Sequence, residues 1–330
     1  MNKVFCLGEA MSDTFLELEG LEICDSCHSV LDTESINKID SRFRGNDKQK
    51  LICLPYGEKI NVKTLAHKSG GSAFNVSVGL KRLGLESHLL ASIGKDSEAM
   101  RLIKAMDHEG IDRSGVIESR DFETKSAIII RGDDGDRTIL VYHGRGVITK
   151  EMIDWDKIED GSWFYLGPLP NTAKELIDYL LVKVEEKKLK LVVNPGSVQI
   201  EWSKKENLKV ISKSELYILN KEEAKTILGR AKNDQELLRT LAKAGAKRLI
   251  ITDGKNGSFG YDGFKFYQQE IVKVKTIDMT GAGDAYLSGV VAALNHQKDL
   301  KEAMHWGAEN SAAVVEKLGG QTGLLGLDKF

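Results

Sequence analysis

Residues 278–290 read DMTGAGDAYLSGV and place a glycine-rich turn and a carboxylate at the start of an apolar helix. Gly281 and Gly283 carry no Cβ, so the chain can turn sharply and aim the N–H groups of residues 281–284 at one point. Unpaired N–H groups at the positive end of a helix dipole bind oxyanions and phosphoryl groups. Asp284 could simply cap the helix, or it could accept the proton of a hydroxyl that attacks a bound phosphate. The segment therefore predicts a phosphate site that contains a candidate base.

Two other phosphate-binding motifs do not occur in the chain. There is no Gly-x4-Gly-Lys-Ser/Thr, and no Gly-x-Gly-x-x-Gly opens a helix after an expected strand. These sequence patterns argue against a P-loop kinase and against a dinucleotide-binding dehydrogenase. The turn at 278–290 is then the strongest functional signal.

The composition indicates a globular protein whose charges are balanced. The 330 residues include 47 Lys plus Arg and 49 Asp plus Glu, which gives a formal net charge of −2. No overall field attracts nucleic acid or an anionic membrane, so we expect neither as a partner. Glu9 interrupts the first apolar stretch, no later stretch is apolar over about 18 residues, and four cysteines do not make a disulfide framework. We therefore expect a cytoplasmic location.

The order of apolar runs predicts one α/β domain over residues 1–330. The run VFCLGEA at 4–10 has the pattern of a buried parallel strand that ends in polar residues. Later strands alternate with helices, which implies a mostly parallel sheet covered by helices on both faces. We expect strands at 87–94, 163–167, 190–194, 215–220 and 248–254, a hairpin at 257–269, and helices at 72–83, 97–109, 171–187, 203–210, 221–244, 282–295 and 299–317. A small β-sheet lid is expected from about 14–20, 51–68 and 125–143.

Residues 24–50 are polar and show neither the helical nor the strand period, so we interpret them as a flexible insertion. Within them, Cys24, Cys27 and His28 have the spacing of a covalent haem site. Zinc or a redox pair is a further alternative, although no second cysteine pair completes the four ligands of a structural zinc site. We favour a solvated segment with no role in the chemistry.

The turn at 278–290 resembles the C-terminal signature of the ribokinase-like (PfkB-type) carbohydrate kinases, and GGSAFNVSVGLKRLG at 70–84 matches a second segment of that family. The resemblance extends over nearly the whole chain outside 24–50. It implies a ribokinase-like fold, a kinase that uses ATP and Mg²⁺, and Asp284 as the catalytic base. The anion hole that it implies consists of the amides of Gly281, Ala282, Gly283 and Asp284.

The resemblance also implies where the substrate binds. In ribokinase-like enzymes the aspartate after the first strand and a Gly-Gly-x-x-x-Asn segment contact the sugar, and Asp13, Gly70, Gly71 and Asn75 match these positions. A carboxylate and an amide that converge in a cleft can read neighbouring hydroxyls as acceptor and donor. Without the resemblance, Asn75 could equally be a first-turn residue of its helix and Asp13 a solvated turn carboxylate.

Further positions resemble nucleotide and metal sites. The run Asn220-Lys221-Glu222-Glu223 matches the family's Asn-x-x-Glu motif, in which the glutamate acts on Mg²⁺ largely through water. The same spacing is that of a capping box, and both roles for Glu223 stay open. Asp278 and Thr280 resemble positions where many family members bind a monovalent cation such as K⁺. The nucleotide contacts that the resemblance implies are Asn220, Thr252, Asp253, Gly254, Gly257 and Asn310.

These features lead us to expect ATP-dependent phosphoryl transfer to a primary hydroxyl of a small sugar, either a monosaccharide or a sugar acid. A nucleoside kinase of the same family is one alternative, and a non-catalytic sugar or nucleotide sensor is an alternative of another class. A nucleoside needs a flat aromatic or apolar surface against its base, and the aromatic side chains near the expected lid are few: Phe15, Tyr56, Phe74 and Tyr142. The expected partners are the sugar and ATP, and the lid is a candidate surface for a homodimer.

Overall fold

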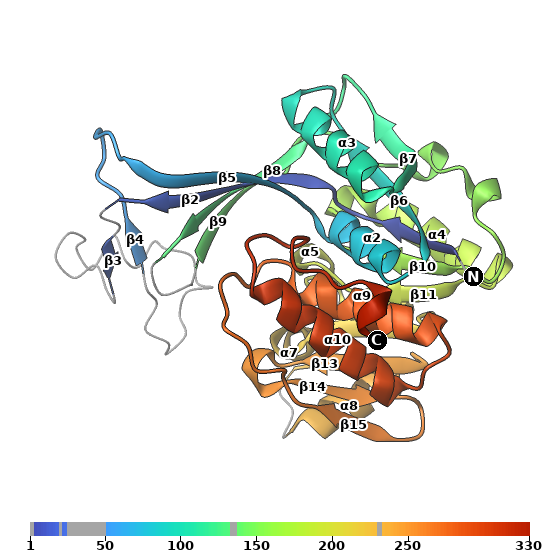
Figure 1. Ribbon diagram of the computed structural model, residues 1–330. Coiled ribbons are helices and arrows are strands. Elements are labelled where there is room, and N and C mark those ends of the chain that lie inside the picture. The colour runs from blue at the N-terminus through green and yellow to red at the C-terminus, as the bar shows by residue number, and fades with distance from the viewer. Residues whose placement is uncertain (1–2, 20–21, 25–50, 133–136, 230–232) are drawn as a thin grey trace.

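A nine-stranded sheet forms the centre of the computed structural model, which describes residues 3–19, 22–24, 51–132, 137–229 and 233–330 (Figure 1). In spatial order its strands are β15 (Phe266–Gln269), β14 (Ser258–Tyr261), β13 (Arg248–Thr252), β12 (Leu216–Asn220), β11 (Lys190–Val193), β10 (Trp163–Leu166), β1 (Lys3–Leu7), β6 (Glu86–Ile93) and β7 (Asp112–Glu118). The strands from β13 to β7 pair in parallel, and β14 and β15 add an antiparallel edge. The expected α/β architecture is confirmed.

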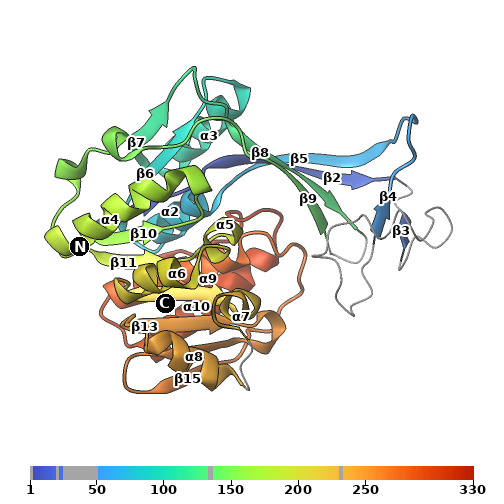
Figure 2. The ribbon, with the colours of Figure 1, turned by 180° about the vertical axis from the view of Figure 1, so that it is seen from behind.

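Helices cover both faces of this sheet (Figures 1 and 2). One face carries α2 (Ser72–Arg82), α3 (Ser97–Glu109), α9 (Ala282–Asn295) and α10 (Leu300–Val315), and the other carries α4 (Lys174–Glu186), α5 (Ser197–Ile200), α6 (Lys204–Ser212), α7 (Lys221–Leu228) and α8 (Asp234–Ala242). Alternate residues of β1 enter different cores, with Val4 and Cys6 in the cluster that contains α2 and Phe5 and Leu7 in the cluster that contains α4. Burial on both sides explains why these strands are continuous apolar runs.

A second sheet of four strands projects from the body, and we call it the lid (Figures 1 and 2). Its strands in spatial order are β5 (Val62–Gly70), β2 (Met11–Leu18), β8 (Lys125–Arg131) and β9 (Arg137–Tyr142). Phe15, Ala127 and Ile129 form a small buried cluster on one face of the lid, against Leu318. Because β2 follows β1 directly and β5 leads directly into α2, the lid is attached at the carboxyl end of β1.

Several elements differ from those expected. The expected helix at 221–244 is divided into α7 and α8, because Gly229 ends the first with a φ of +88° and Asn233 caps the second. In the stretch 51–60, only β4 (Leu51–Cys53) is a strand, and it pairs with β3 (Glu22–Cys24) in a separate two-stranded sheet rather than with the lid. Strand β7 was not expected, since its side chains are only partly buried and make no apolar run.

The expected insertion and its cysteine–histidine pattern fall outside the described residues, except for Cys24 at the end of β3. Across the part of the chain that is described, no helix combines the length and the apolar character that crossing a bilayer requires.

Candidate active site

The candidate site lies at the carboxyl ends of the central strands, where the first turns of α2 and α9 meet. Chain connections lead from β1 to β6 on one side of the sheet, whereas β10 lies on the other side of β1. In parallel α/β sheets, ligands bind outside the carboxyl ends of the strands at such a reversal of strand order. The first turns of α2 and α9 lie side by side there, because Ser72 and Asn75 of α2 both bond to Asp284 of α9.

Asp284 is held by donors on both of its carboxylate oxygens. The Ser72 hydroxyl donates to Oδ1 at 2.6 Å, and the Asn75 amide donates from Nδ2 to Oδ2 at 2.8 Å. Ser72 Oγ also lies 2.7 Å from the hydroxyl of Tyr165 on β10. Burial raises the pKa of Asp284 to about 6, the negative charge of Glu9 adds to this, and the two hydrogen bonds oppose it. The carboxylate is therefore fixed in direction and more basic than an ordinary aspartate.

The two glycines before Asp284 differ in the space that a side chain would meet there. Gly281 adopts a φ of +76°, and a Cβ there would lie 2.4 Å from the Cα of Gly320, so only glycine fits. A Cβ on Gly283 would meet no atom within 4 Å. Ala282 N donates to Met279 O at 3.3 Å, whereas among described residues the amides of Gly281, Gly283 and Asp284 find no backbone acceptor. Open space above free amides at a helix N-terminus suits a phosphoryl group.

Asp13 of β2 is a second carboxylate at this site, only 4% exposed. Burial raises its pKa to about 7, and the charges of Asp278 and Asp284 contribute to the shift. A Cβ on Gly70 would lie 2.1 Å from Asp13 Oδ2, and one on Gly71 would lie 2.5 Å from the carbonyl oxygen of Glu9. Both glycines therefore permit the start of α2 to approach the ends of β1 and β2.

The carboxylate of Asp278 ties the glycine turn to the C-terminal segment. Its Oδ1 accepts hydrogen bonds from Thr280 N at 3.0 Å and Thr280 Oγ1 at 2.8 Å, and its Oδ2 accepts one from Gly319 N at 2.9 Å. The residue is 1% exposed. In this structure Asp278 and Thr280 are thus brought together, in contact with the segment that follows α10.

Asn220 and Glu223 form a reciprocal capping box at the start of α7. Asn220 N donates to Glu223 Oε2 at 2.8 Å, and Glu223 N donates to Asn220 Oδ1 at 2.9 Å. Burial raises the pKa of the Glu223 carboxyl. Asn220 is paired with Thr252 in the sheet, which brings the loop after β13 beside α7. Asp253 of that loop bonds to Lys221 at 2.8 Å.

Asn310 lies away from any open surface. It is 0% exposed on α10, and its Nδ2 donates to Ala285 O at 2.8 Å and to Ser288 Oγ at 3.1 Å. Its Oδ1 accepts a hydrogen bond from Leu325 N at 2.9 Å. The three hydrogen bonds of Asn310 thus join α10 to α9 and to the segment that follows α10.

The described residues of the site could hold a magnesium ion through only one or two protein ligands. In the described part of the chain, no three His, Cys, Asp or Glu side chains gather in a way that could hold a metal ion. Mg²⁺ keeps several waters and takes one or two carboxylates together with substrate phosphates. The capping box uses Glu223 Oε2, so Oε1 can serve as such a ligand.

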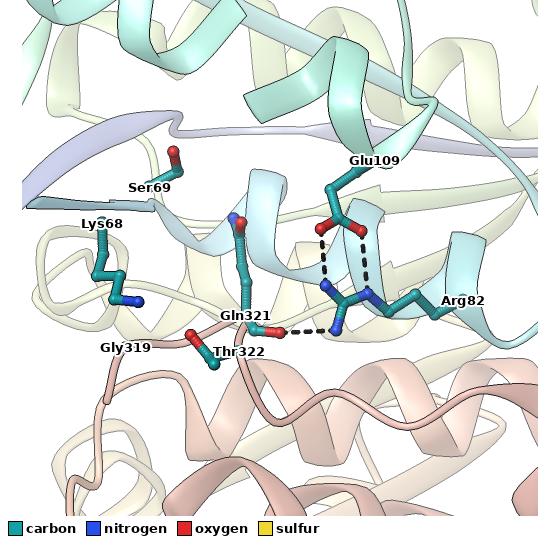
Figure 3. A pocket seen from close by; sticks show the side chains of 7 residues that line it. All are labelled: Lys68, Ser69, Arg82, Glu109, Gly319, Gln321 and Thr322. Carbon is teal, nitrogen blue, oxygen red and sulfur yellow. Dashed lines mark hydrogen bonds and ion pairs between the residues drawn. The ribbon is translucent and has the colours of Figure 1, made fainter. Parts of the chain in front are cut away.

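Two cavities among the described residues bear on where a ligand could bind. One, of about 240 Å³, lies beside the site between β5, α2 and residues 319–322, and Figure 3 shows its lining residues. The other, of about 520 Å³, is lined by Lys3, Glu86 and Asp112 at the amino ends of β1, β6 and β7. The larger cavity thus lies at the amino ends of the strands, whereas ligands of parallel α/β folds bind outside the carboxyl ends.

Sequence reasoning did not find Ser72, Tyr165 or Gln321. Ser72 is three residues before Asn75 on the same face of α2, so the spacing could have linked the two. Tyr165 is an apolar-looking residue inside a buried strand, and nothing in its neighbours marks it. Gln321 reaches the site only through the path of the chain after α10, where its Nε2 donates to Asn75 Oδ1 at 3.0 Å.

Comparison with known proteins gives one family. The family model described as "pfkB family carbohydrate kinase" matches residues 38–325. A nucleoside kinase of Methanocaldococcus jannaschii is 31% identical over 276 residues, which cover 79% of this chain and 83% of that protein. A probable fructokinase-7 of Arabidopsis thaliana is 25% identical over 279 residues, 76% of this chain and 79% of that protein.

The solved structures share the fold. A ribokinase from Thermotoga maritima superposes with a TM-score of 0.77 at 19% identity, with 100% of this chain and 96% of that chain covered. At this identity the likeness establishes the architecture alone. It agrees with the large parallel sheet and the smaller lid described above.

Proposed function

The chain belongs to the pfkB family of carbohydrate kinases, and from this premise we propose that it transfers the γ-phosphoryl group of ATP to a primary hydroxyl of a monosaccharide or sugar acid. The observation that carries the proposal is Asp284, a carboxylate with two donors and a pKa of about 6. A base with that pKa is ionised at neutral pH and can still accept a proton in a transition state. The free amides beside it supply the anion site that the transferred group needs.

Each residue of the site has a part in this reaction. Asp13 and the segment of Gly70, Gly71 and Asn75 hold the sugar hydroxyls, so that the terminal CH₂OH points at Asp284. Asp284 then takes the hydroxyl proton as the oxygen attacks the γ-phosphorus, and the bond from that phosphorus to the bridging oxygen breaks, so that ADP leaves. The amides of residues 281–284, at the positive end of α9, stabilise the negative charge on the transferring group. Ser72 keeps the carboxylate turned toward the hydroxyl.

The nucleotide is proposed to lie over the carboxyl ends of β12 and β13, against Asn220, Thr252, Asp253, Gly254 and Gly257. When bound, Mg²⁺ would supply positive charge that offsets the negative charge of the ATP phosphates. Glu223 is the residue that we propose holds it, largely through water. Asp278 and Thr280 are the proposed positions for a monovalent cation such as K⁺. Asn310 contributes indirectly, by fixing α10 against α9.

Sugar is the preferred acceptor because two of the four aromatic side chains near the lid, Phe15 and Phe74, are buried and cannot stack against a base, while Tyr56 and Tyr142 are exposed. Phe15 and Phe74 are 2% and 0% exposed and belong to the cores, and the Tyr142 hydroxyl donates to Glu123 at the edge of the lid. A nucleoside is the second candidate, since a nucleoside kinase is among the similar proteins at 31% identity. The two acceptors differ in the need for stacking against a base.

A substrate panel with released ADP as the readout separates the two acceptors. Wild-type protein is assayed with free monosaccharides, sugar acids, adenosine, inosine and cytidine at saturating Mg²⁺-ATP. We expect the best sugar to have a kcat/KM at least about tenfold above every nucleoside, about 1.4 kcal/mol of transition-state binding. If a nucleoside is the best acceptor, the sugar assignment fails, while the role of Asp284 is left standing.

We also propose that two copies of the chain pair through their lids. Leu65, Ile128 and Leu140 of the lid are 58%, 42% and 52% exposed, and this exposed apolar surface is suited to a protein partner.

Since the donor is ATP, the cytoplasm is the proposed compartment, and subcellular fractionation of tagged protein tests it.

A further inference from the structure

Gln321 contacts the residue that contacts the proposed base. Its Nε2 donates to Asn75 Oδ1 at 3.0 Å, and Asn75 Nδ2 donates in turn to Asp284 Oδ2 at 2.8 Å. Asn75 is 4% exposed, so bulk water is not available to replace either hydrogen bond. The three side chains form a continuous chain from the segment after α10 to the carboxylate.

The orientation of the Asn75 side-chain amide determines whether its nitrogen or its oxygen faces the Asp284 carboxylate. A side-chain amide has a donor end and an acceptor end that differ by a half-turn about its last bond. The ionised Asp284 carboxylate only accepts, so it favours the orientation in which Nδ2 of Asn75 faces it, and Gln321 matches that orientation by donating to Oδ1 of Asn75. With the amide turned over, the oxygen of Asn75 would face a carboxylate oxygen and the pair would repel.

The main chain of Gln321 is held in place by the side chain of Arg82. Arg82 NH1 donates to the carbonyl oxygen of Gln321 at 2.9 Å and to that of Leu324 at 3.1 Å. The same guanidinium forms a bidentate pair with Glu109, with distances of 2.7 and 3.0 Å, as Figure 3 shows. These contacts fix the position of residues 321–324 against the last turns of α2 and α3.

The residue before Gln321 allows the segment to come this close. A Cβ on Gly320 would lie 2.8 Å from Asn75 Nδ2, and the Cα of Gly320 already blocks any side chain at Gly281. The C-terminal segment therefore touches both the turn of the anion site and the amide beside the base.

We propose that Gln321 is a positioning residue for phosphoryl transfer: by donating to Asn75 it fixes the amide orientation that presents Nδ2 to Asp284. The inference rests on the proposed role of Asp284. Loss of the donor leaves Asp284 with one fixed partner, Ser72, and a carboxylate that can rotate away from the attacking hydroxyl. Turnover then falls, whereas ATP binding on the far side of the glycine turn is unaffected.

The test is a double-mutant cycle measured by kcat and by KM for ATP. Gln321→Met keeps the length of the side chain and removes the donor, and Gln321→Glu replaces the donor by an acceptor. Each is combined with Asn75→Ala. Thr322→Val is the matched control, because it also removes one hydrogen bond of the same segment, to Leu318 O, without touching Asn75.

We expect Gln321→Met to lower kcat about tenfold and Gln321→Glu to lower it further, with KM for ATP unchanged within about twofold. In the Asn75→Ala background neither change should lower kcat again, because the residues act as one unit. Thr322→Val should match the wild type.

The inference is overturned if Gln321→Met matches the wild type, or if it lowers kcat by the same factor with and without Asn75. Thermal melting of each variant identifies any loss of folding. If Gln321→Met does not fold, Gln321→Glu is compared with the wild type in its place. Asp284→Asn is assayed alongside. An inactive Asp284→Asn with a fully active Gln321→Met rejects this inference alone, whereas an active Asp284→Asn rejects the proposed role of Asp284 as the base as well.

Discussion

Asp13 is buried beside two other carboxylates, and this placement has a cost in stability that depends on pH. Its pKa in the folded protein is raised to about 7 by burial and by the charges of Asp278 and Asp284. A raised carboxyl pKa means that the ionised form is disfavoured in the fold. The contribution of the protonated Asp13 carboxyl to the stability is therefore fully present below the pKa of the unfolded chain. It is lost as the pH rises through the pKa of the folded protein.

Asp13→Asn should therefore stabilise the protein at pH 8 more than at pH 5, by about 2–3 kcal/mol. The measurement is urea unfolding of both proteins at the two pH values, in buffer without divalent metal or substrate. Asp121→Asn changes an exposed carboxylate and serves as the control. An equal effect of Asp13→Asn at pH 5 and pH 8 would show that Asp13 is not strained by burial.

For single residues, the sequence predicted those that stand in a recognisable motif. It missed those that reach the site only through the path of the folded chain. Asp284 and Asn75 stand in recognisable motifs, and the structure brings them within hydrogen-bonding distance. Tyr165 and Gln321 enter the same network from β10 and from beyond α10. Neither residue stands in a motif that marks it as functional, so no local pattern revealed them.

The first turn of α9 is the element on which the anion site depends, and its two glycines predict different outcomes. Gly281→Ala forces a side chain into a φ of +76° and against Gly320, so we expect a loss of at least about 2 kcal/mol of stability. Gly283→Ala adds a methyl group in open space, and stability should stay equal or rise by up to about 1 kcal/mol.

Activity should nevertheless fall in both variants, because the methyl group of Gly283→Ala occupies the space proposed for the phosphoryl group. Thermal melting combined with kcat measurement separates the two effects. A Gly283→Ala protein with wild-type turnover would mean that the phosphoryl group does not approach α9 at this residue.

Elements with strong end signals were predicted well, and those without them were not. Helix α3 lies where the sequence placed it, with Asp96 as its cap and Gly110 after its end. The division of 221–244 carried a signal that was missed, since Gly229 and the pair Asn233 and Glu236 are a helix stop and a capping spacing. Strand β7 has no such signal, because it is a half-exposed edge strand.

At the scale of the whole molecule, the proposed dimer makes a direct prediction. Leu140→Glu and Ile128→Glu place charges on the exposed apolar surface of the lid, and they should convert a dimer into a monomer. Sedimentation equilibrium of both variants and of the wild type measures this. A wild-type protein that sediments as a single chain at micromolar concentration contradicts the proposal.

Strand alternation predicted the layers of the molecule but not the order of its strands. The order depends on which side of β1 each crossover returns, and local periodicity holds no information about that. The lid illustrates the same limit, since β2 pairs in parallel with β8, more than a hundred residues later in the chain. Such pairings are set by the body, which brings the ends of the lid strands together.

The turnover of Asp284→Asn tests the central claim most directly. The amide keeps the size and the hydrogen bonding of the side chain but cannot take a proton. With the best acceptor sugar at pH 8, kcat should fall by about 10²–10⁴ while the dissociation constant for ATP, measured by calorimetry, stays nearly unchanged. A variant that keeps more than about a tenth of the wild-type kcat would contradict Asp284 as the base.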